Sequence, residues 1–229
     1  MAQKATKPNG KLGVMVVGLG AVTSTFMTGV LMARKGLAKP VGSMTQYDKI
    51  RVGRGNDKKY LHYKDIVPLA DLNDIIFGAW DVYPVNAYQA AMNAQVLKEK
   101  DIEPVRDELE QIVALPAAFD HNYAKRLDGD NIKKAADRWD MTEQIREDIR
   151  AFKARTGVER VVVLWAASTE VYVPVDKDVH YTLEALEKAM RADDKEHIAP
   201  SMCYAYAALK EGAPFIMGCL LYTSDAADE

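Results

Sequence analysis

The sequence has little of what marks disulfide-rich, metal-binding or membrane proteins. Its only two cysteines, Cys203 and Cys219, are too few for a disulfide framework and too far apart for a CxxC metal site. The four histidines are scattered without HxH or HxxE spacing, so we expect no metal ligands among them. No apolar run reaches the ~18 residues of a membrane span, and the polar start lacks the apolar core of a secretory signal.

Neither sign of charge dominates, since 30 basic residues face 33 acidic ones for a net charge of -3. We therefore expect neither nucleic acid nor a membrane as a partner. A hydrophobic content of 48% is enough for one good core, and the default location is the cytoplasm. We expect residues 1–10 to form a polar leader, 11–218 one domain, and 219–229 a foreign tail, because this last stretch fits neither helix nor strand periodicity.

Short buried strands alternate with helices along the chain. The strands are predicted at 11–17, 75–80, 160–165 and 214–217, largely apolar on both faces as in a parallel sheet that helices cover on both sides. The helices are predicted at 21–35, 84–100, 104–112, 142–157, 181–191 and 200–211, with a helical turn at 68–74. The stretch 41–67 is expected to be mostly loop. This order indicates an α/β fold, a Rossmann-type doubly wound parallel sheet.

The first predicted strand leads through a glycine turn into a helix, which is the setting of a dinucleotide-binding motif. Its first glycine permits a tight turn, and its second lets the backbone approach a pyrophosphate at the positive end of the helix. The predicted contacts are Gly18, Gly20, Ala21, Val22 and Thr23. Thr23 replaces the usual third glycine, and its bulk departs from strict dehydrogenase geometry. The alternative is a turn that only connects strand and helix.

An acidic residue at the end of the second strand usually holds the ribose of the cofactor. Asp81 follows the predicted strand at 75–80, and its alternative role is to cap a helix near Pro84. Asp48 is the other carboxylate that follows the glycine turn, but it lies in a predicted loop, so we interpret it as a solvated residue.

Small and hydroxylated residues follow the predicted strand at 160–165. Ala166 and Ala167 would let the backbone approach a ligand closely, and Ser168 and Thr169 can bond to a ribose or a nicotinamide amide. An N-cap pair before a loop is an equally good interpretation of the two hydroxyls.

Five segments, taken in order, resemble inositol-3-phosphate synthases of a bacterial or archaeal-like kind. They lie at 16–21, 41–46, 67–81, 163–170 and 204–218. The runs Gly-Ala-Trp-Asp, ending at Asp81, and Leu-Trp-Ala-Ala-Ser-Thr-Glu, ending at Glu170, weigh most because generic dehydrogenases lack them.

The resemblance implies an NAD-dependent isomerase. Such an enzyme converts glucose 6-phosphate to 1D-myo-inositol 3-phosphate by internal oxidation, aldol cyclisation and reduction, and is typically a homotetramer. The resemblance also implies that the glycine turn holds the pyrophosphate, that Asp81 contacts the adenosine ribose, and that residues 166–169 line the cofactor. Ser168 stands where eukaryotic members have Asn.

The resemblance ends at Gly218. Met217 stands where the family has Asn, and the family's catalytic lysines lie beyond this point, so no lysine of this chain takes their role. We therefore expect a sheet truncated before the catalytic α+β domain, with no catalytic residue and no activity of the fragment alone. The rival interpretations are another NAD(P)-dependent oxidoreductase of small sugars or alcohols, and a non-enzymatic interaction module.

Overall fold

The computed structural model describes residues 10–218, and a five-stranded parallel sheet forms its centre. The strands are β1 (Leu12–Val17), β4 (Ile75–Asp81), β5 (Ala114–Pro116), β6 (Arg160–Trp165) and β7 (Phe215–Met217). Their order is β5-β4-β1-β6-β7, and Val17 at the end of β1 pairs with Trp80 on one side and Trp165 on the other. The strand order reverses at β1, which is where open α/β sheets bind ligands.

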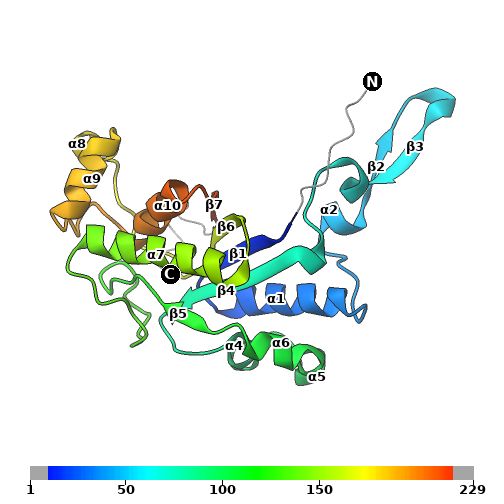
Figure 1. The fold of residues 1–229 in the computed structure, drawn as a ribbon, viewed down its shortest axis with the longest axis horizontal. Helices are drawn as coiled ribbons and strands as arrows, with labels where there is room; N and C mark the ends of the chain where they lie inside the picture. Colours follow the sequence, from blue (N-terminus) through cyan, green and yellow to red (C-terminus); the bar gives the residue numbers. More distant parts are fainter. Residues whose placement is uncertain (1–9, 219–229) are drawn as a thin grey trace.

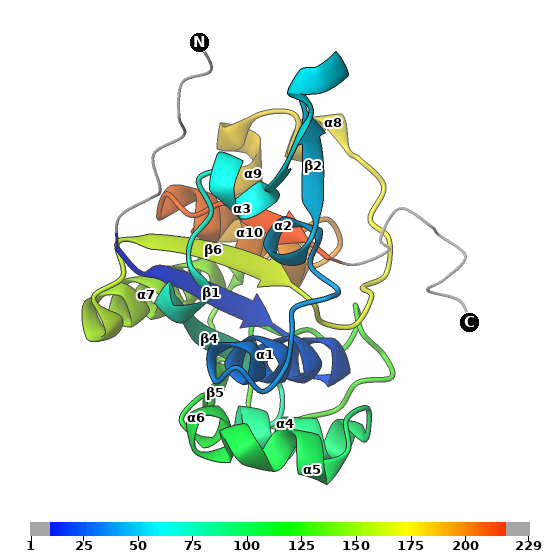
Figure 2. The same ribbon diagram turned by 90° about the vertical axis from the view of Figure 1, so that its right-hand side faces the viewer.

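Helices cover both faces of this sheet, as Figure 2 shows. One face carries α1 (Ala21–Arg34), α4 (Ala87–Ala94), α5 (Glu99–Ile102) and α6 (Arg106–Glu110). The other carries α7 (Arg138–Thr156) and α10 (Pro200–Lys210), with α9 (Leu183–Arg191) packed beside α7. The predicted doubly wound α/β fold is confirmed.

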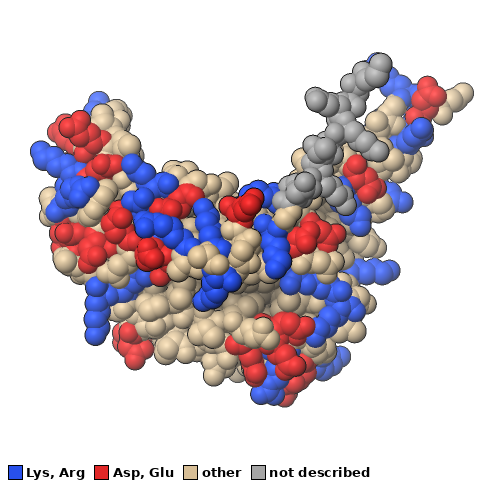
Figure 3. Space-filling model, viewed as in Figure 1, with Lys and Arg blue, Asp and Glu red and all other residues tan. Residues whose placement is uncertain are grey.

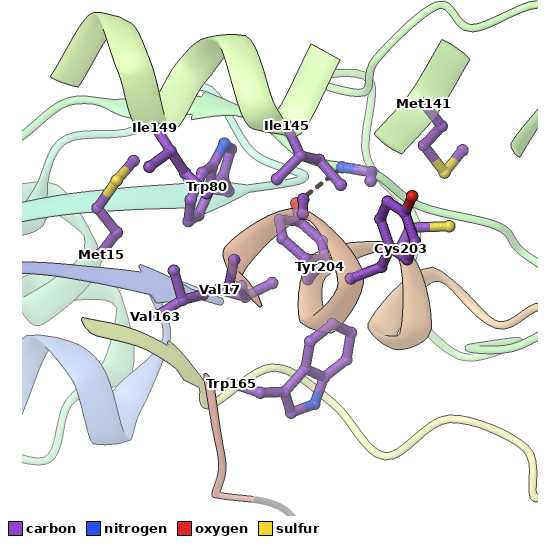
Figure 4. Packing of buried hydrophobic residues seen from close by; sticks show 14 of the residues in the cluster. Met15, Val17, Trp80, Met141, Ile145, Ile149, Val163, Trp165, Cys203 and Tyr204 are labelled. Atoms are coloured by element: carbon purple, nitrogen blue, oxygen red, sulfur yellow. Dashed lines mark hydrogen bonds between the residues drawn. The ribbon is translucent and has the colours of Figure 1, made fainter. Parts of the chain in front are cut away.

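Three aromatic side chains join the sheet to α10 (Figure 4). Tyr204 is fully buried, and its ring makes edge contacts with Trp80 and Trp165 at centroid distances of 5.2 and 5.8 Å. Its hydroxyl accepts a hydrogen bond of 2.9 Å from the backbone N–H of Ala118, so the buried oxygen is satisfied. The segment after β5 is thereby held against α10.

The amphipathic helix expected around 142–157 is α7, and it begins earlier, at Arg138. Asp137 caps its N-terminus by accepting from the backbone N–H of Asp140. Gly157 ends it as predicted, in the left-handed conformation with φ of 70°. Ile145 and Ile149 are buried against the sheet, so packing reinforces what the caps begin.

The expectation that 41–67 is mostly loop is wrong. The segment holds α2 (Met44–Tyr47), β2 (Lys49–Val52), the 3-10 turn η1 (Gly55–Asp57), β3 (Lys59–His62) and α3 (Tyr63–Ile66). The strands β2 and β3 pair antiparallel and project from the body as a hairpin (Figure 1). Charged and apolar residues alternate along β2, which is a strand pattern, but not along β3. Nearly every position of both strands is exposed, so no buried run marks them.

Several other boundaries differ from the prediction. The helix expected at 84–100 stops at Ala94, because Gln95 adopts a left-handed conformation with φ of 55°. The short edge strand β5 and the single turn α8 (Lys177–His180) were not predicted, since neither is long enough to show a period. The 3-10 turns η2 (Leu72–Asp74) and η3 (Glu103–Val105) lie where short helical turns were expected.

Lys and Arg side chains are interspersed with Asp and Glu over the face drawn in Figure 3. Between residues 10 and 218, no helix is both long and apolar enough to cross a membrane. The tail expected at 219–229 and most of the leader at 1–10 lie outside the described residues.

Candidate functional site

A pocket of about 710 Å³ lies at the carboxyl ends of β1, β4 and β6. Its walls are the glycine turn and the first residues of α1, the residues after β4, the segment 117–127 after β5, the segment after β6, and Pro200 at the start of α10. This is the reversal point of the strand order, and the volume lies in the usual range for ligand and cofactor sites.

The two glycines of the turn have the separate roles that the motif predicts. Gly18 has a φ of +91°, and a Cβ there would lie only 2.6 Å from Cα of Ala167, so other residues are excluded. Gly20 has an extended backbone with φ of -93°, and a Cβ there would meet nothing within 4 Å. Gly20 therefore keeps the space in front of the turn open rather than satisfying a backbone constraint.

The N-terminus of α1 faces this open space without a side-chain cap. Gly20 is the N-cap residue, its position supplies no side-chain cap, and the first turn holds no acidic residue. The free backbone N–H groups and the helix dipole make such an end attractive to an anion. Gly20, Ala21 and Val22 all line the pocket.

Thr23 is accommodated where the motif usually has glycine. It is buried, and its Oγ1 donates to the carbonyl oxygen of Gly18 over 2.6 Å. The hydroxyl thus closes the turn from behind, and Thr23 is not among the residues that line the pocket. The larger side chain stabilises the turn without occupying the anion side.

Asp81 lies at the end of β4 and borders the pocket. Its Oδ2 accepts from the backbone N–H of Leu19 over 2.5 Å, and its Oδ1 accepts from that of Tyr83 over 2.9 Å. The alternative that Asp81 caps the following helix is wrong, because Asn86 caps α4 and forms a capping box with Gln89. Asp81 instead ties the glycine turn to the neighbouring strand.

The segment after β6 forms the opposite wall. Ala166, Ala167 and Ser168 line the pocket, whereas Thr169 does not. The backbone N–H of Ala166 donates to the carbonyl of Val17 over 2.9 Å, which keeps this wall close to the glycine turn. No helix starts at Ser168 or Thr169, so the N-cap interpretation is wrong; the next helix, α8, is capped by Asp176.

Glu170 also lines the pocket, although it was not predicted as a site residue. It is 4% exposed, and its carboxylate accepts from the backbone N–H of Ser201 at 3.2 Å and from the Ser201 hydroxyl. Burial raises the pKa of Glu170 to about 7, and the hydrogen bonds from Ser201 offset part of this rise. Its place at the end of the Leu-Trp-Ala-Ala-Ser-Thr-Glu run was the one available signal.

Asp120 was missed because it follows β5, which was itself not predicted. It lines the pocket and accepts from Nη2 of the buried Arg138 over 2.5 Å. The charged residues that line the pocket are therefore three carboxylates, Asp81, Asp120 and Glu170, and no lysine or arginine is among them. An anionic group in this pocket would be met by backbone N–H groups. In the described part of the chain, no cluster of His, Cys, Asp and Glu could hold a metal ion.

Comparison with known proteins agrees with this geometry. Residues 12–223 match the model of an NAD-binding domain family described as myo-inositol-1-phosphate synthase. The chain belongs to that family. The matched range extends to residue 223, which lies within the stretch expected to be foreign.

Individual members of the family are similar over nearly the whole chain. Inositol-3-phosphate synthase 1 of Bacteroides thetaiotaomicron is 60% identical over 95% of this chain and 50% of its own length. Inositol-3-phosphate synthase 1 of Oryza sativa subsp. japonica is 36% identical over 94% of the chain and 45% of its own length. The chain thus spans about half the length of the curated relatives that it matches.

Two solved structures share the fold. The crystal structure of inositol-3-phosphate synthase from Caenorhabditis elegans superposes with a TM-score of 0.85 at 28% identity, covering 96% of this chain and 48% of that one. A myo-inositol-1-phosphate synthase-related protein from Thermotoga maritima has a TM-score of 0.55 at 19% identity, covering 90% and 47%. The second likeness concerns the fold alone.

Proposed function

We propose that this pocket binds NAD, and that the chain is the cofactor-binding part of an inositol-3-phosphate synthase. The whole enzyme would convert glucose 6-phosphate to 1D-myo-inositol 3-phosphate as a cytoplasmic homotetramer. The observation that carries the proposal is the empty space in front of Gly20, beside the uncapped end of α1. Family membership supports it independently.

We assign each part of the dinucleotide to one region of the pocket. The pyrophosphate would lie against the turn formed by Gly18, Gly20, Ala21 and Val22, where backbone N–H groups meet its charge. The adenosine ribose would lie over β4 and bond to Asp81. The nicotinamide half would lie over β6, along residues 166–169, because the two halves of a dinucleotide bind on either side of the reversal point.

The chain's own contribution to the reaction is binding and orientation. NAD, when bound, supplies a hydride acceptor and returns the hydride within the same cycle. The residues described here would keep the cofactor in place throughout, through the rigid glycine turn and the Leu19–Asp81 bond. The groups that bind the sugar phosphate are proposed to lie in the half of the relatives that this chain does not span.

Isothermal titration of the 229-residue chain with NAD tests the proposal. We expect saturable binding at one site, preference for NAD over NADP, and loss of binding in the variant Gly20→Val. The matched control is Gly36→Val, at an exposed turn far from the pocket, which should lower stability without preventing binding. Binding that is absent in the folded wild type, or unchanged in Gly20→Val, would refute the site.

A further inference from the structure

The two ends of the pocket differ in how their charges are balanced. On the β4 side, both carboxylate oxygens of Asp81 accept hydrogen bonds from backbone N–H groups. On the β6 side, the pocket is bordered by Glu170, and Asp120, from the segment after β5, also lines the pocket and interacts electrostatically with Glu170. The proposed function puts the nicotinamide at this second end of the pocket.

Among the residues that the structure describes, only one of these two carboxylates has a cationic partner within ion-pair distance. Arg138 is 2% exposed, and its Nη2 lies 2.5 Å from Oδ2 of Asp120, so this pair contributes no net charge. Glu170 is held instead by Ser201, whose N–H and hydroxyl are neutral donors. Arg138 and Asp120 are the charged groups that Glu170 senses most strongly, and their effects on it have opposite signs. When ionised, Glu170 therefore gives this end of the pocket an excess negative charge, which the positive N-terminal end of α10 offsets in part through the N–H of Ser201.

This charge distinguishes the two redox forms of a nicotinamide. The oxidised ring is a pyridinium cation, and the reduced ring is neutral, while the rest of the dinucleotide is identical. A buried carboxylate near the ring attracts the first form and has little effect on the second. The same carboxylate gains from the cation, because a nearby positive charge offsets the cost of keeping Glu170 ionised away from water.

We propose that Glu170 makes this pocket selective for the oxidised form of the cofactor. The inference rests on the proposed function, since it requires a nicotinamide dinucleotide in the pocket. Ser201 acts as a positioning residue, because its two hydrogen bonds aim the Glu170 carboxylate and fix the segment after β6 to the start of α10. The selectivity would favour loading of the pocket with the oxidised cofactor before the cycle begins.

The size of the effect follows from Coulomb's law. For an assumed separation on the order of 8 Å between the carboxylate and the ring charge, in a medium of effective dielectric constant about 20 to 80, the interaction changes a binding constant by roughly 2-fold to 30-fold. We therefore expect Glu170→Gln to reduce the ratio of NAD⁺ affinity to NADH affinity by a factor in that range. Glutamine is isosteric and can still accept from the N–H of Ser201, so the fold of the variant should be preserved.

The experiment measures dissociation constants of the 229-residue chain for NAD⁺, NADH and ADP-ribose at pH 8.5. NAD⁺ and ADP-ribose are titrated calorimetrically, and NADH is followed by its fluorescence. In Glu170→Gln, affinity for NAD⁺ should fall, while affinities for NADH and ADP-ribose stay close to the wild type. Glu184→Gln, an exposed glutamate on α9, is the matched control and should leave all three constants unchanged.

The outcomes separate this inference from the proposed function. Suppose that the wild type binds the dinucleotides, and that Glu170→Gln lowers the affinities for NAD⁺ and NADH equally or changes neither. The proposed selectivity is then refuted, while the cofactor site stands. If the wild type binds none of the three ligands, the proposed function itself fails. Should Glu170→Gln not fold, the wild type at pH 6.0 and 8.5 gives the same comparison, because protonation removes the charge without a substitution; an NAD⁺/NADH affinity ratio equal at both pH values would then refute the inference.

Discussion

The backbone N–H of Leu19, in the middle of the glycine turn, donates to Oδ2 of Asp81 at the end of the neighbouring strand over 2.5 Å. The bond joins the proposed pyrophosphate site to the proposed ribose site across a separation of 62 residues in the chain. The carboxylate that we propose as a ribose ligand thus also holds the glycine turn in position. Substitution of Asp81 is expected to change both properties.

In Asp81→Ala, the partly buried N–H of Leu19 loses its acceptor, which costs about 1–3 kcal/mol of stability, whereas the exposed N–H of Tyr83 can bond to water. The affinity for NAD should fall at least about tenfold, since one charged hydrogen bond is lost and the turn is loosened. Asp81→Asn keeps one acceptor oxygen but removes the charge that opposes a 2′-phosphate, so its preference for NAD over NADP should narrow.

Urea unfolding and calorimetric titration with NAD and NADP measure these effects. An Asp81→Asn variant that discriminates against NADP as strongly as the wild type would show that the carboxylate does not face the ribose. An Asp81→Ala variant of unchanged stability would show that the Leu19 bond contributes nothing to the fold.

The two glycines of the turn should respond differently to a side chain. Gly18→Ala forces a Cβ to within 2.6 Å of the Ala167 backbone at a φ of +91°, so it should lower the free energy of unfolding by more than about 2 kcal/mol. Gly20→Val places its side chain in open space at an extended φ, so its stability should stay within about 1 kcal/mol of the wild type while NAD binding is lost.

Thermal unfolding monitored by circular dichroism, together with NAD titration, separates the two roles. The opposite pattern, a stable Gly18→Ala and an unfolded Gly20→Val, would contradict the assignment of strain to Gly18 and of ligand space to Gly20.

The sequence alone predicted four of the five strands of the sheet and the parts of the pocket at the ends of β1, β4 and β6, because these depend on local signals. The strands β1, β4 and β6 are short apolar runs, and Gly18, Gly20 and Asp81 stand at their ends, so periodicity and turn chemistry were sufficient. Of the ten residues predicted to contact the cofactor, all but Thr23 and Thr169 line the pocket. Their contacts with NAD remain predictions.

The part of the pocket that Asp120 and Glu170 form depends on contacts between distant segments, which no local pattern reveals. Asp120 follows the three-residue strand β5, and its partner Arg138 lies on α7. Glu170 is placed by Ser201, which is 31 residues away on α10. The projecting hairpin was not predicted for a different reason. Its strands bury almost nothing, so no apolar run marks them in the sequence.

The affinity for NAD⁺ should depend on pH near neutrality. The pKa of Glu170 is about 7 in the unliganded pocket, because burial disfavours its charge, and a bound pyridinium would lower that pKa. NAD⁺ therefore binds the ionised form more tightly, so its affinity should rise between pH 6 and pH 8 and level off above. NADH carries no ring charge, and its affinity should change much less over the same interval.

Titrations at half-unit pH steps check this dependence, and the variant Glu170→Gln should give a flat profile for NAD⁺. Arg138 and Asp120, the charged groups that face Glu170, form an ion pair with each other. A wild-type profile that is flat from pH 6 to pH 8, or one whose slope survives in Glu170→Gln, would contradict the assignment.

Asp148 on α7 should be the main polar contributor to stability on the face of the sheet that α7 and α10 cover. Its Oδ2 accepts from Nε1 of Trp80 over 2.7 Å and lies 2.6 Å from Nζ of Lys133, whose side chain is only 6% exposed. In Asp148→Asn the amide oxygen can still accept from Trp80, but Lys133 keeps a buried charge without its partner. Loss of one partner of a buried pair costs about 3–5 kcal/mol, and partial exposure of Asp148 places our expectation at the lower end.

The double variant Asp148→Asn with Lys133→Met removes both charges and keeps the acceptor for Trp80, so it should be more stable than Asp148→Asn alone. Glu147→Gln is the matched control on the same helix, because Glu147 is 69% exposed and pairs only at the surface with Arg150, which is worth less than about 1 kcal/mol. Urea unfolding of the wild type, Asp148→Asn, Lys133→Met and the double variant measures the coupling, and Glu147→Gln is unfolded beside them. If Lys133→Met fails to restore stability to Asp148→Asn, the unpaired ammonium is not the source of the loss, and the Trp80 bond must carry it instead.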